Sequence, residues 1–331
     1  MRTVAALSLQ LLLQCLLPAA SLCVSFTLGP ETLQPYPSPH PYQFPDAAIA
    51  FVEDGPAARL LFWSDGTTYR VSGTDLPFPA NAPSPLTPVL GAGEKGAYDA
   101  NGNWFLAAFR DPLRPASLVA FTHVENHGFL CPGGYAEWNA GAVVTSQDDG
   151  VTWAREGLAI GDPQPCAPTF GGAGYSSVLQ PPSGGGFLGY GGCTAYRSLH
   201  AQGLPGTWLR WKGGEFSSPG VNGSSDCLPG VPPNACCPIV HYNAYLKAFV
   251  MVYDKWGQPG TFYLATSADG LSWGASQVLL QAEGNRSIAY GQILGAHNAS
   301  QAGQAAVLAY AAAPPVGGHP RDFVYRTITF S

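Results

Sequence analysis

Hydrophobic residues along this chain come in pairs of short runs, and a turn of polar or glycine-rich sequence separates the two runs of each pair. Within a run, apolar residues alternate with other residues, which is the period of a β-strand with one buried face. Two such strands joined by a short turn predict a β-hairpin. The sequence predicts five of these hairpins, at residues 47–64, 96–109, 175–192, 241–253 and 290–310.

The spacing of the hairpins predicts how they assemble. They recur about every 60 residues, and a hairpin cannot bury both of its faces alone, so repeated units stack around an axis as propeller blades do. The chain holds 41 Gly and 31 Pro among 331 residues, which disfavours long helices, while its 46% hydrophobic content excludes disorder. We expect an all-β fold, a single five-bladed β-propeller domain over residues 24–331.

The N-terminus predicts the secretory route. Arg2 precedes an apolar run from Val4 to Leu17, and small residues follow it, so residues 1–23 read as a signal peptide. The alternative is a membrane anchor, but the run is shorter than the roughly 20 apolar residues that a span needs. We expect a secreted protein with no membrane span. Three Asn-x-Ser sequons predict glycosylation at Asn222, Asn285 and Asn298.

Six cysteines remain after the signal peptide, namely Cys131, Cys166, Cys193, Cys227, Cys236 and Cys237. An even number in an oxidising compartment predicts disulfides. A bond from Cys227 to Cys236 or Cys237 would staple a Gly/Pro-rich loop, and the other neighbour is expected to pair elsewhere, because adjacent cysteines rarely meet disulfide geometry with each other; the exact pairing stays open. A zinc site is the alternative, but the chain has no Cys-x-x-Cys pair. We expect no metal and no cofactor.

Charge narrows the choice of partner. Only 11% of the residues are charged, the net charge is −6, and the chain has four scattered lysines. Phosphate recognition depends on clustered Lys and Arg, so nucleic acid is not the expected partner. A neutral glycan fits the composition better, and the oligomeric state stays open.

A second repeat is a turn motif. Residues 146–153 match the Asp-box pattern Ser/Thr-x-Asp-x-Gly-x-Thr-Trp, residues 266–273 keep its spacing with Ala268 in place of the first Asp, and residues 62–69 are a more degenerate copy. Carboxylate capping of the turn and the freedom of glycine explain these residues as structural, not catalytic. The structural set is Ser146, Asp148, Gly150, Trp153, Asp269, Gly270 and Trp273.

The Asp-boxes resemble those of sialidases and other glycoside hydrolases. The segments 121–127, 172–176, 208–216 and 240–246 look closer to five-bladed glycoside-hydrolase-like propellers related to arabinanases and fructosidases. A six-bladed sialidase-like propeller is the alternative fold. Sialidases carry an Arg-Ile-Pro motif, which this chain lacks. The resemblance implies cleavage of a glycosidic bond by carboxylates that lie in the axial funnel.

Two acidic residues are the catalytic candidates. Asp46 directly precedes the first hairpin and resembles the base of arabinanase-like enzymes, although it could be a turn residue after Pro45. His123, Glu125 and His127 follow an apolar run, and a period of two places them on one strand face. Glu125 is the expected general acid, with His123 and His127 binding substrate. A solvated strand end and, less favoured, a metal cluster are the alternatives.

Polar and aromatic residues also stand at the heads of the later hairpins. Residues at equivalent repeat heads should converge on the axis, where they suit sugar hydroxyls and ring faces, although such residues are often only packing elements. The expected binding residues are Tyr175, His241, Asn243 and Tyr290. Two functions follow as hypotheses: a secreted glycoside hydrolase, or a non-catalytic propeller that binds carbohydrate or protein.

Overall fold

The computed structural model describes residues 24–33, 45–53, 59–73, 86–111, 114–127, 137–162, 171–284, 286–296, 299–313 and 321–331. The expected signal peptide, Asn285, Asn298, Cys131 and Cys166 lie outside these residues. Every regular element in the described part is a β-strand, as expected. None of the described segments is a helix of the length and hydropathy needed to cross a bilayer.

The strands form five sheets, numbered here in chain order. Sheet 1 contains β3 (Ala50–Glu53), β4 (Arg59–Ser64), β5 (Thr68–Gly73) and β6 (Thr87–Leu90). Sheet 2 contains β7 (Gly102–Asp111), β8 (Arg114–His127), β9 (Glu137–Ser146), β10 (Ala154–Ile160) and β11 (Gly171–Ala173). Sheet 3 contains β12 (Ser177–Leu179), β13 (Phe187–Gly191), β14 (Thr194–Ser198), β15 (Trp208–Lys212) and β16 (Glu215–Pro219).

Sheet 4 contains β17 (Ala235–Asn243), β18 (Ala248–Lys255), β19 (Gln258–Ser267), β20 (Gln277–Gln281) and β22 (Gln301–Ala302). Sheet 5 contains β21 (Ser287–Leu294), β23 (Ala305–Ala313), β24 (Asp322–Phe330) and the two N-terminal strands β1 (Phe26–Leu28) and β2 (Thr32–Leu33). Neighbouring strands are antiparallel except β11 on β9 and β22 on β17. The last sheet is therefore built from both ends of the described chain.

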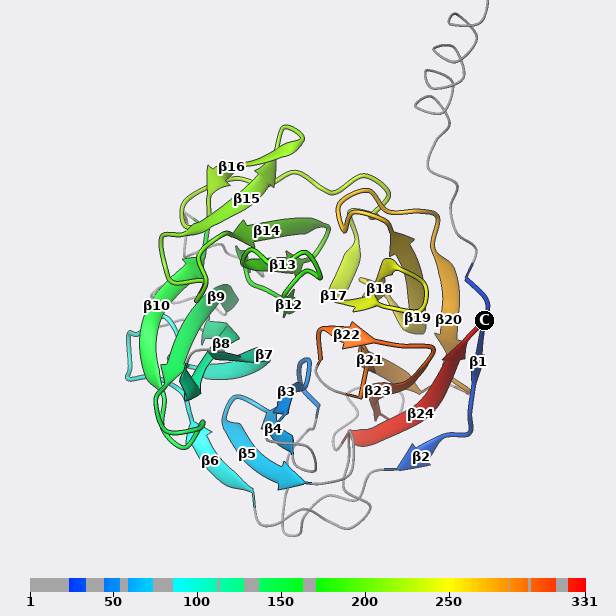
Figure 1. The fold of residues 1–331 in the computed structure, drawn as a ribbon, viewed down its shortest axis with the longest axis horizontal. Coiled ribbons are helices and arrows are strands. Elements are labelled where there is room, and N and C mark those ends of the chain that lie inside the picture. Colours follow the sequence, from blue (N-terminus) through cyan, green and yellow to red (C-terminus); the bar gives the residue numbers. More distant parts are fainter. Residues whose placement is uncertain are drawn as a thin grey trace, which may run out of the picture.

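The five sheets follow one another around a central axis (Figure 1). Strand β3 packs on β7, β7 on β12, β12 on β17, and β17 on β21, so these five are the innermost strands. The Gln292 side chain closes the ring, because its Oε1 accepts from Ile49 N at 2.7 Å and its Nε2 donates to Ile49 O at 3.1 Å. The arrangement is propeller-like, as the repeat predicted.

The predicted hairpins correspond to the inner pair of strands in four of the sheets. In sheet 2 the prediction is only half right: residues 96–101 are a turn, and β7 pairs with β8 further along the chain. The alternation of apolar residues therefore identified the strands that face the axis. Outer strands such as β10 and β16 consist largely of exposed and half-buried residues, and their sequences lack a regular alternation of apolar residues.

An aromatic cluster fills the space between sheets 2 and 3. Phe121 of β8 is fully buried, and its ring lies 4.7 Å from Phe187, 5.3 Å from Trp208 and 6.0 Å from Phe109 between centroids. Tyr175 contacts the same Phe121 ring at 6.3 Å. Large rings in edge-to-face contact bury much apolar area and hold the two sheets at a fixed distance.

The turn at 146–153 joins β9 to β10 and is held by side-chain caps. Ser146 Oγ accepts from Gly150 N at 2.9 Å, and Asp148 accepts from Thr152 N at 2.9 Å and Thr152 Oγ1 at 2.6 Å. The hydrogen bond from the Thr152 hydroxyl, with those from the Thr152 amide and Ser146, lowers the pKa of Asp148 to about 2. Trp153 packs edge-on against Phe105. These contacts give the residues a structural role.

The turn at 266–273 joins β19 to β20. Its capping residues, Ser267 and Asp269, each lie one residue after the positions that match Ser146 and Asp148 in the sequence motif. Asp269 corresponds to Asp148 in its contacts, because its Oδ1 accepts from Ser267 Oγ at 2.8 Å and from Ser272 N at 2.7 Å. Ala268 therefore does not replace the capping acid. Trp273 is buried against Tyr190, whose hydroxyl donates to Gly270 O at 3.0 Å.

The degenerate copy at 62–69 is a different kind of turn. It joins the second and third strands of its sheet, β4 and β5, whereas the other two turns join the third and fourth strands of theirs. Consecutive connections alternate between the two faces of the ring, because successive strands run antiparallel. Asp65 in this turn therefore faces the same side as Asp46, whose amide donates to Ser64 O at 3.4 Å.

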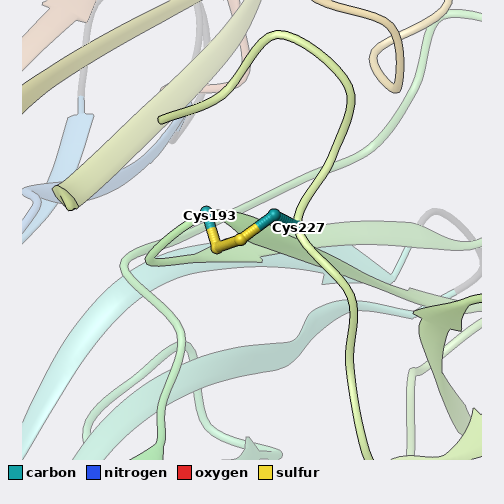
Figure 2. The surroundings of a disulfide bond; sticks show 2 residues. All are labelled: Cys193 and Cys227. Carbon is teal, nitrogen blue, oxygen red and sulfur yellow. A yellow bond between two sulfur atoms is a disulfide. The ribbon is translucent and has the colours of Figure 1, made fainter. Parts of the chain in front are cut away.

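The described residues contain one disulfide, and it differs from the expected pairing. Cys193, just after β13, bonds to Cys227 in the loop that follows β16 (Figure 2). Cys227 therefore does not bond to Cys236 or Cys237, and these two carry no disulfide in the structure. Sequence distance favoured the nearer partner, but the ladder of sheet 3 brings the loop back over the start of β14.

Candidate functional site

A cavity of about 1200 Å³ opens where the inner strands begin. Its wall includes residues from all five sheets or the segments that lead into them. Those that matter for chemistry include Asp46, Trp104, His123, Glu125, Tyr175 and Tyr290. A volume of this size, with a mixed aromatic and charged wall, fits a ligand of several sugar units.

Asp46 lies on this wall at the entry to sheet 1 and accepts three side-chain hydrogen bonds. Trp104 Nε1 donates to Oδ2 at 3.1 Å, Tyr290 Oη donates to Oδ1 at 3.3 Å, and Arg321 also donates to Oδ1. These donors come from sheet 2, sheet 5 and the segment before β24. Distant parts of the chain thus fix the orientation of one carboxylate.

Glu125 stands at the end of β8 between two histidines. His123 Nε2 lies 3.0 Å from Oε1, and His127 Nε2 lies 2.7 Å from Oε2, so the three predicted neighbours do meet. Burial raises the pKa of Glu125, but hydrogen bonds and charge from His123 and His127 outweigh it and leave the pKa below its usual value. In the unliganded protein Glu125 is ionised at neutral pH. This differs from the raised pKa expected of a general acid.

Trp104 links the two carboxylates. Its indole N–H binds Asp46, and its ring meets the His123 ring edge-on with centroids 5.6 Å apart. Gly174 packs against the other side of His123, where a Cβ would lie 2.7 Å from Nδ1. The imidazole is thereby confined between an indole and a backbone, which sets the direction in which it meets Glu125.

Two tyrosines complete the aromatic part of the wall. Tyr175 is 2% exposed and its hydroxyl has no partner among the described residues. Its ring fits between Gly141 and Gly189, where any Cβ would overlap the ring atoms. Tyr290 has φ of +59°, an unfavourable backbone conformation for this residue type that directs the ring toward Asp46.

Three expected binding residues lie elsewhere. His127 contacts Glu125 but is not part of the cavity wall. His241 is 2% exposed inside sheet 4, and burial lowers its pKa to about 3. The Asn243 amide holds the turn after β17, since its Oδ1 accepts from Tyr245 N and Leu246 N, and its Nδ2 donates to Gly303 O. We therefore replace the expected binding role of these two residues: His241 contributes to packing, and Asn243 to turn formation.

The reason for this correction is the start of β17. The sequence suggested a strand that begins near His241, but β17 begins at Ala235, so His241 and Asn243 occupy its far end. The residues at the head of the strand are Cys236 and Cys237, and both line the cavity. The apolar residues that precede His241 in the sequence could have indicated this earlier start of the strand.

An arginine on the cavity wall was also missed. Arg210 of β15 is 2% exposed, yet its guanidinium is satisfied by Asp162 Oδ1 at 3.0 Å, Gly161 O at 2.6 Å and Gly220 O at 2.8 Å. Arg210 and Asp162 both border the cavity. A charged residue inside the apolar stretch Trp208–Trp211 was the signal in the sequence.

Asp65 is a further acid on the same face, although it is not on the cavity wall. Burial, opposed by a hydrogen bond from the Thr67 backbone and reinforced by the charge of Asp46, raises its pKa to about 7. An acid with an unfolded pKa of about 3.9 and a higher folded pKa binds more protons when folded. Ionisation of Asp65 therefore costs stability, and this cost grows from about pH 4 to pH 7.

We expect Asp65→Asn to remove this cost. The gain in free energy of unfolding over the wild type should be near zero at pH 4 and about 1–2 kcal/mol at pH 8, after allowance for partial exposure. Urea denaturation across this pH range measures it. Asp148→Asn is the matched control with the opposite sign, since the pKa of Asp148 is lowered. An equal effect of Asp65→Asn at both pH values would contradict the prediction.

No protein-family model and no curated protein sequence matches the chain. Solved structures do. A family 117 glycoside hydrolase from the marine bacterium Zobellia galactanivorans aligns with a TM-score of 0.55 and 8% identity over 93% of this chain and 90% of that chain. The Bacillus subtilis arabinanase aligns with a TM-score of 0.51 and 9% identity over 92% and 97%.

The catalytic domain of a Coprinopsis cinerea family 62 α-L-arabinofuranosidase aligns with a TM-score of 0.50 and 12% identity over 92% of this chain and 97% of that chain. At such low identity these likenesses concern the fold alone. The expected likeness to glycoside-hydrolase propellers is confirmed at that level, and the chain has the all-β, propeller-like architecture of those proteins.

Proposed function

We propose that this protein is a five-bladed β-propeller that cleaves a glycosidic bond in its axial cavity. The observation that carries the proposal is that Asp46 and Glu125 both line one cavity of about 1200 Å³ and are linked through Trp104, whose indole binds Asp46 and whose ring meets His123 beside Glu125. Glycoside hydrolysis requires two carboxyl groups on either side of the scissile bond, and aromatic rings bind the faces of sugars. Each of the five sheets is one blade.

The proposed roles follow from the environments of the two acids. Asp46, which is fixed by Trp104, Tyr290 and Arg321, acts as the base. Glu125 acts as the general acid once substrate is bound. A sugar that covers the 17% of its side chain still exposed would increase the contribution of burial, which acts to raise the pKa of Glu125 against the lowering by its hydrogen bonds.

The choice of substrate for the first assays comes from the solved structures. Two of them are named as an arabinanase and an α-L-arabinofuranosidase. We therefore propose arabinan, arabinotriose and an aryl α-L-arabinofuranoside as the first probes. A wider panel of neutral oligosaccharides follows, because the shared fold hosts more than one activity.

The test is hydrolysis of these probes by the purified protein and by Glu125→Gln. We expect turnover by the wild type and a loss of about a hundredfold to ten-thousandfold in kcat for the variant, the usual contribution of general acid catalysis. Glu156→Gln is the matched control, since Glu156 is an exposed residue of sheet 2 that accepts a hydrogen bond from Thr145 and does not line the cavity. Undiminished turnover by Glu125→Gln would remove Glu125 from the mechanism.

One observation favours a second function. The ionised state of Glu125 in the unliganded protein suits a fixed hydrogen-bond acceptor as well as a catalyst, so a non-catalytic glycan-binding propeller is the second candidate. Binding of arabinotriose by calorimetry without cleavage of any probe would support this candidate over the hydrolase. Absence of both binding and cleavage across the panel would count against both.

The compartment and the modifications complete the proposal. We propose that residues 1–23 direct secretion, that Asn222, Asn285 and Asn298 carry glycans, and that the turns at 146–153 and 266–273 are Asp-boxes. Asn222 lies in a turn at the end of β16 and has φ of +61°. Glycosidase treatment followed by mass spectrometry of the secreted protein tests the glycan sites.

A further inference from the structure

The head of β17 places two adjacent cysteines on the cavity wall. Cys236 Sγ lies 2.9 Å from Cys237 Sγ, and both residues line the cavity that also holds Asp46 and Tyr290. The other two described cysteines are already bonded to each other. Cys236 and Cys237 are therefore each other's nearest possible partner among the cysteines that the structure describes.

The backbone explains why adjacent sulfurs meet. Successive side chains in a regular strand point to opposite faces, which would separate the two thiols. Here the pairing register with β18 shifts after Cys236, and Cys237 has φ of +50°. Ser177 of sheet 3 holds this bulge, because its Oγ donates to Pro238 O at 2.9 Å and accepts from Val240 N at 3.1 Å. The bulge turns both sulfurs the same way.

A left-handed backbone at Cys237 has an energetic cost. A non-glycine residue with this φ costs of the order of 1–3 kcal/mol, and such residues are found where the surroundings or a function require them. The following residue is proline, which further restricts the conformation of Cys237. Neither restriction is needed for a thiol pair that serves only as packing.

A metal site is the alternative explanation. Cys236, Cys237 and Asp254 offer three ligand atoms within 4.8 Å of one another. Two thiolates on a tetrahedral zinc ion lie about 3.8 Å apart, given zinc–sulfur bonds of about 2.3 Å, which is wider than the 2.9 Å observed. The two sulfurs are therefore closer together than two ligands of one zinc ion would be.

We propose that Cys236 and Cys237 form a disulfide between neighbouring residues, an eight-membered ring in the wall of the axial cavity. Two thiols lose two protons and two electrons as the sulfur–sulfur bond forms. The electrons pass by thiol–disulfide exchange to a protein or small-molecule disulfide, which is reduced to two thiols. The secretory route proposed above provides such oxidants.

The ring also has a role at the ligand site, and this part rests on the proposed function. A closed ring presents two sulfur atoms as a fixed apolar surface, whereas two thiols can rotate and donate hydrogen bonds. Trp256, 60% exposed, and Tyr290 line the same cavity. Together they add apolar surface to the cavity that also holds the polar groups around Glu125, a combination suited to the apolar and polar faces of a sugar.

Mass spectrometry of the secreted full chain tests the ring itself. The protein is denatured, treated with iodoacetamide without reductant, digested, and sequenced by tandem mass spectrometry. We expect a segment with Cys236 and Cys237 that is unalkylated, lacks two hydrogens and is not linked through either residue to another cysteine. The Cys193–Cys227 bond in the same digest is the internal control for preserved oxidation state.

Three results would overturn the proposed disulfide between Cys236 and Cys237. These are alkylation of both cysteines, a bond from either one to Cys131 or Cys166, and one equivalent of zinc that is retained by the native protein and lost from Cys236→Ser. None of these results depends on a sugar ligand, so the disulfide proposal can be wrong while the proposed function stands.

Calorimetry with arabinotriose tests the role at the ligand site. We expect the Kd to rise about tenfold in the Cys236→Ser/Cys237→Ser variant, and the same rise in the wild type after selective reduction and alkylation of the pair. Equal Kd values in wild type and variant would overturn the contact with ligand. If the wild type itself does not bind arabinotriose while the ring is present, this choice of ligand for the proposed function fails, and the ring remains.

Discussion

Replacing Asp46 with asparagine is expected to lower kcat/KM of the proposed hydrolysis by about a thousandfold or more. The asparagine has nearly the shape of aspartate but cannot act as a base. It also brings an NH2 group against side chains that all donate to this position, namely Trp104, Tyr290 and Arg321. Steady-state kinetics on the substrate identified in the screen measures the loss.

Two comparisons separate chemistry from folding in this experiment. Asp111→Asn serves as the matched control, because Asp111 pairs with Arg114 at the far end of β7 and does not border the cavity. Urea denaturation of Asp46→Asn reports the cost of leaving Arg321 without its carboxylate. A folded Asp46→Asn protein with wild-type kcat/KM would show that Asp46 is not the base.

Truncating Phe121 to alanine is expected to reduce the free energy of unfolding by about 4 kcal/mol. The side chain is fully buried, and its ring contacts Phe109, Phe187 and Trp208, so its removal leaves a cavity between sheets 2 and 3. Chemical denaturation measures the difference. Because Tyr175 packs on the same ring, ligand affinity should fall as well.

Phe121→Leu is the control for volume. It retains most of the buried apolar area and should cost less than half as much as alanine. A loss below about 1 kcal/mol for Phe121→Ala would mean that the sheets relax to fill the space, and the description of this cluster as a rigid spacer would then be incorrect.

The propeller-like fold could be predicted because the sequence pattern that indicates it is local. Alternation of apolar residues within strands such as β8 and β18, with glycine-rich turns between them, is visible in any short window. The repetition of these strands then implied a ring. The outer strands were not predicted, because a strand at the exposed edge of a sheet needs no apolar face. Its sequence then resembles that of a loop.

The site was only partly predictable, because several of its residues are far apart in the sequence. His123, Glu125 and His127 lie on one strand, so a period of two was enough to place them together. Asp46 was selected by its position before a repeat, but its partners Trp104 and Arg321 are brought to it by ring closure. Residues that converge from different sheets leave no local pattern in the sequence.

The error at β17 has a different cause. A β-bulge adds residues to one strand without changing which residues are apolar, so the alternation gives no warning of it. The predicted hairpin covered residues 241–253, so the Cys-Cys-Pro segment before Ile239 lay outside it, although β17 begins at Ala235. The true head of the strand then remained hidden, together with the sulfurs on the cavity wall.

The pairing of β1 with β24 has a consequence for how the molecule is made. Phe26 pairs with Phe330, so the last sheet must wait for almost the whole chain to be synthesised. Until Asp322–Phe330 have emerged, the last sheet is incomplete: β1 has no partner, and one edge of β23 presents bare backbone groups to its surroundings. Such edges recruit other chains, so a translation product that stops short of β24 is a seed for aggregation.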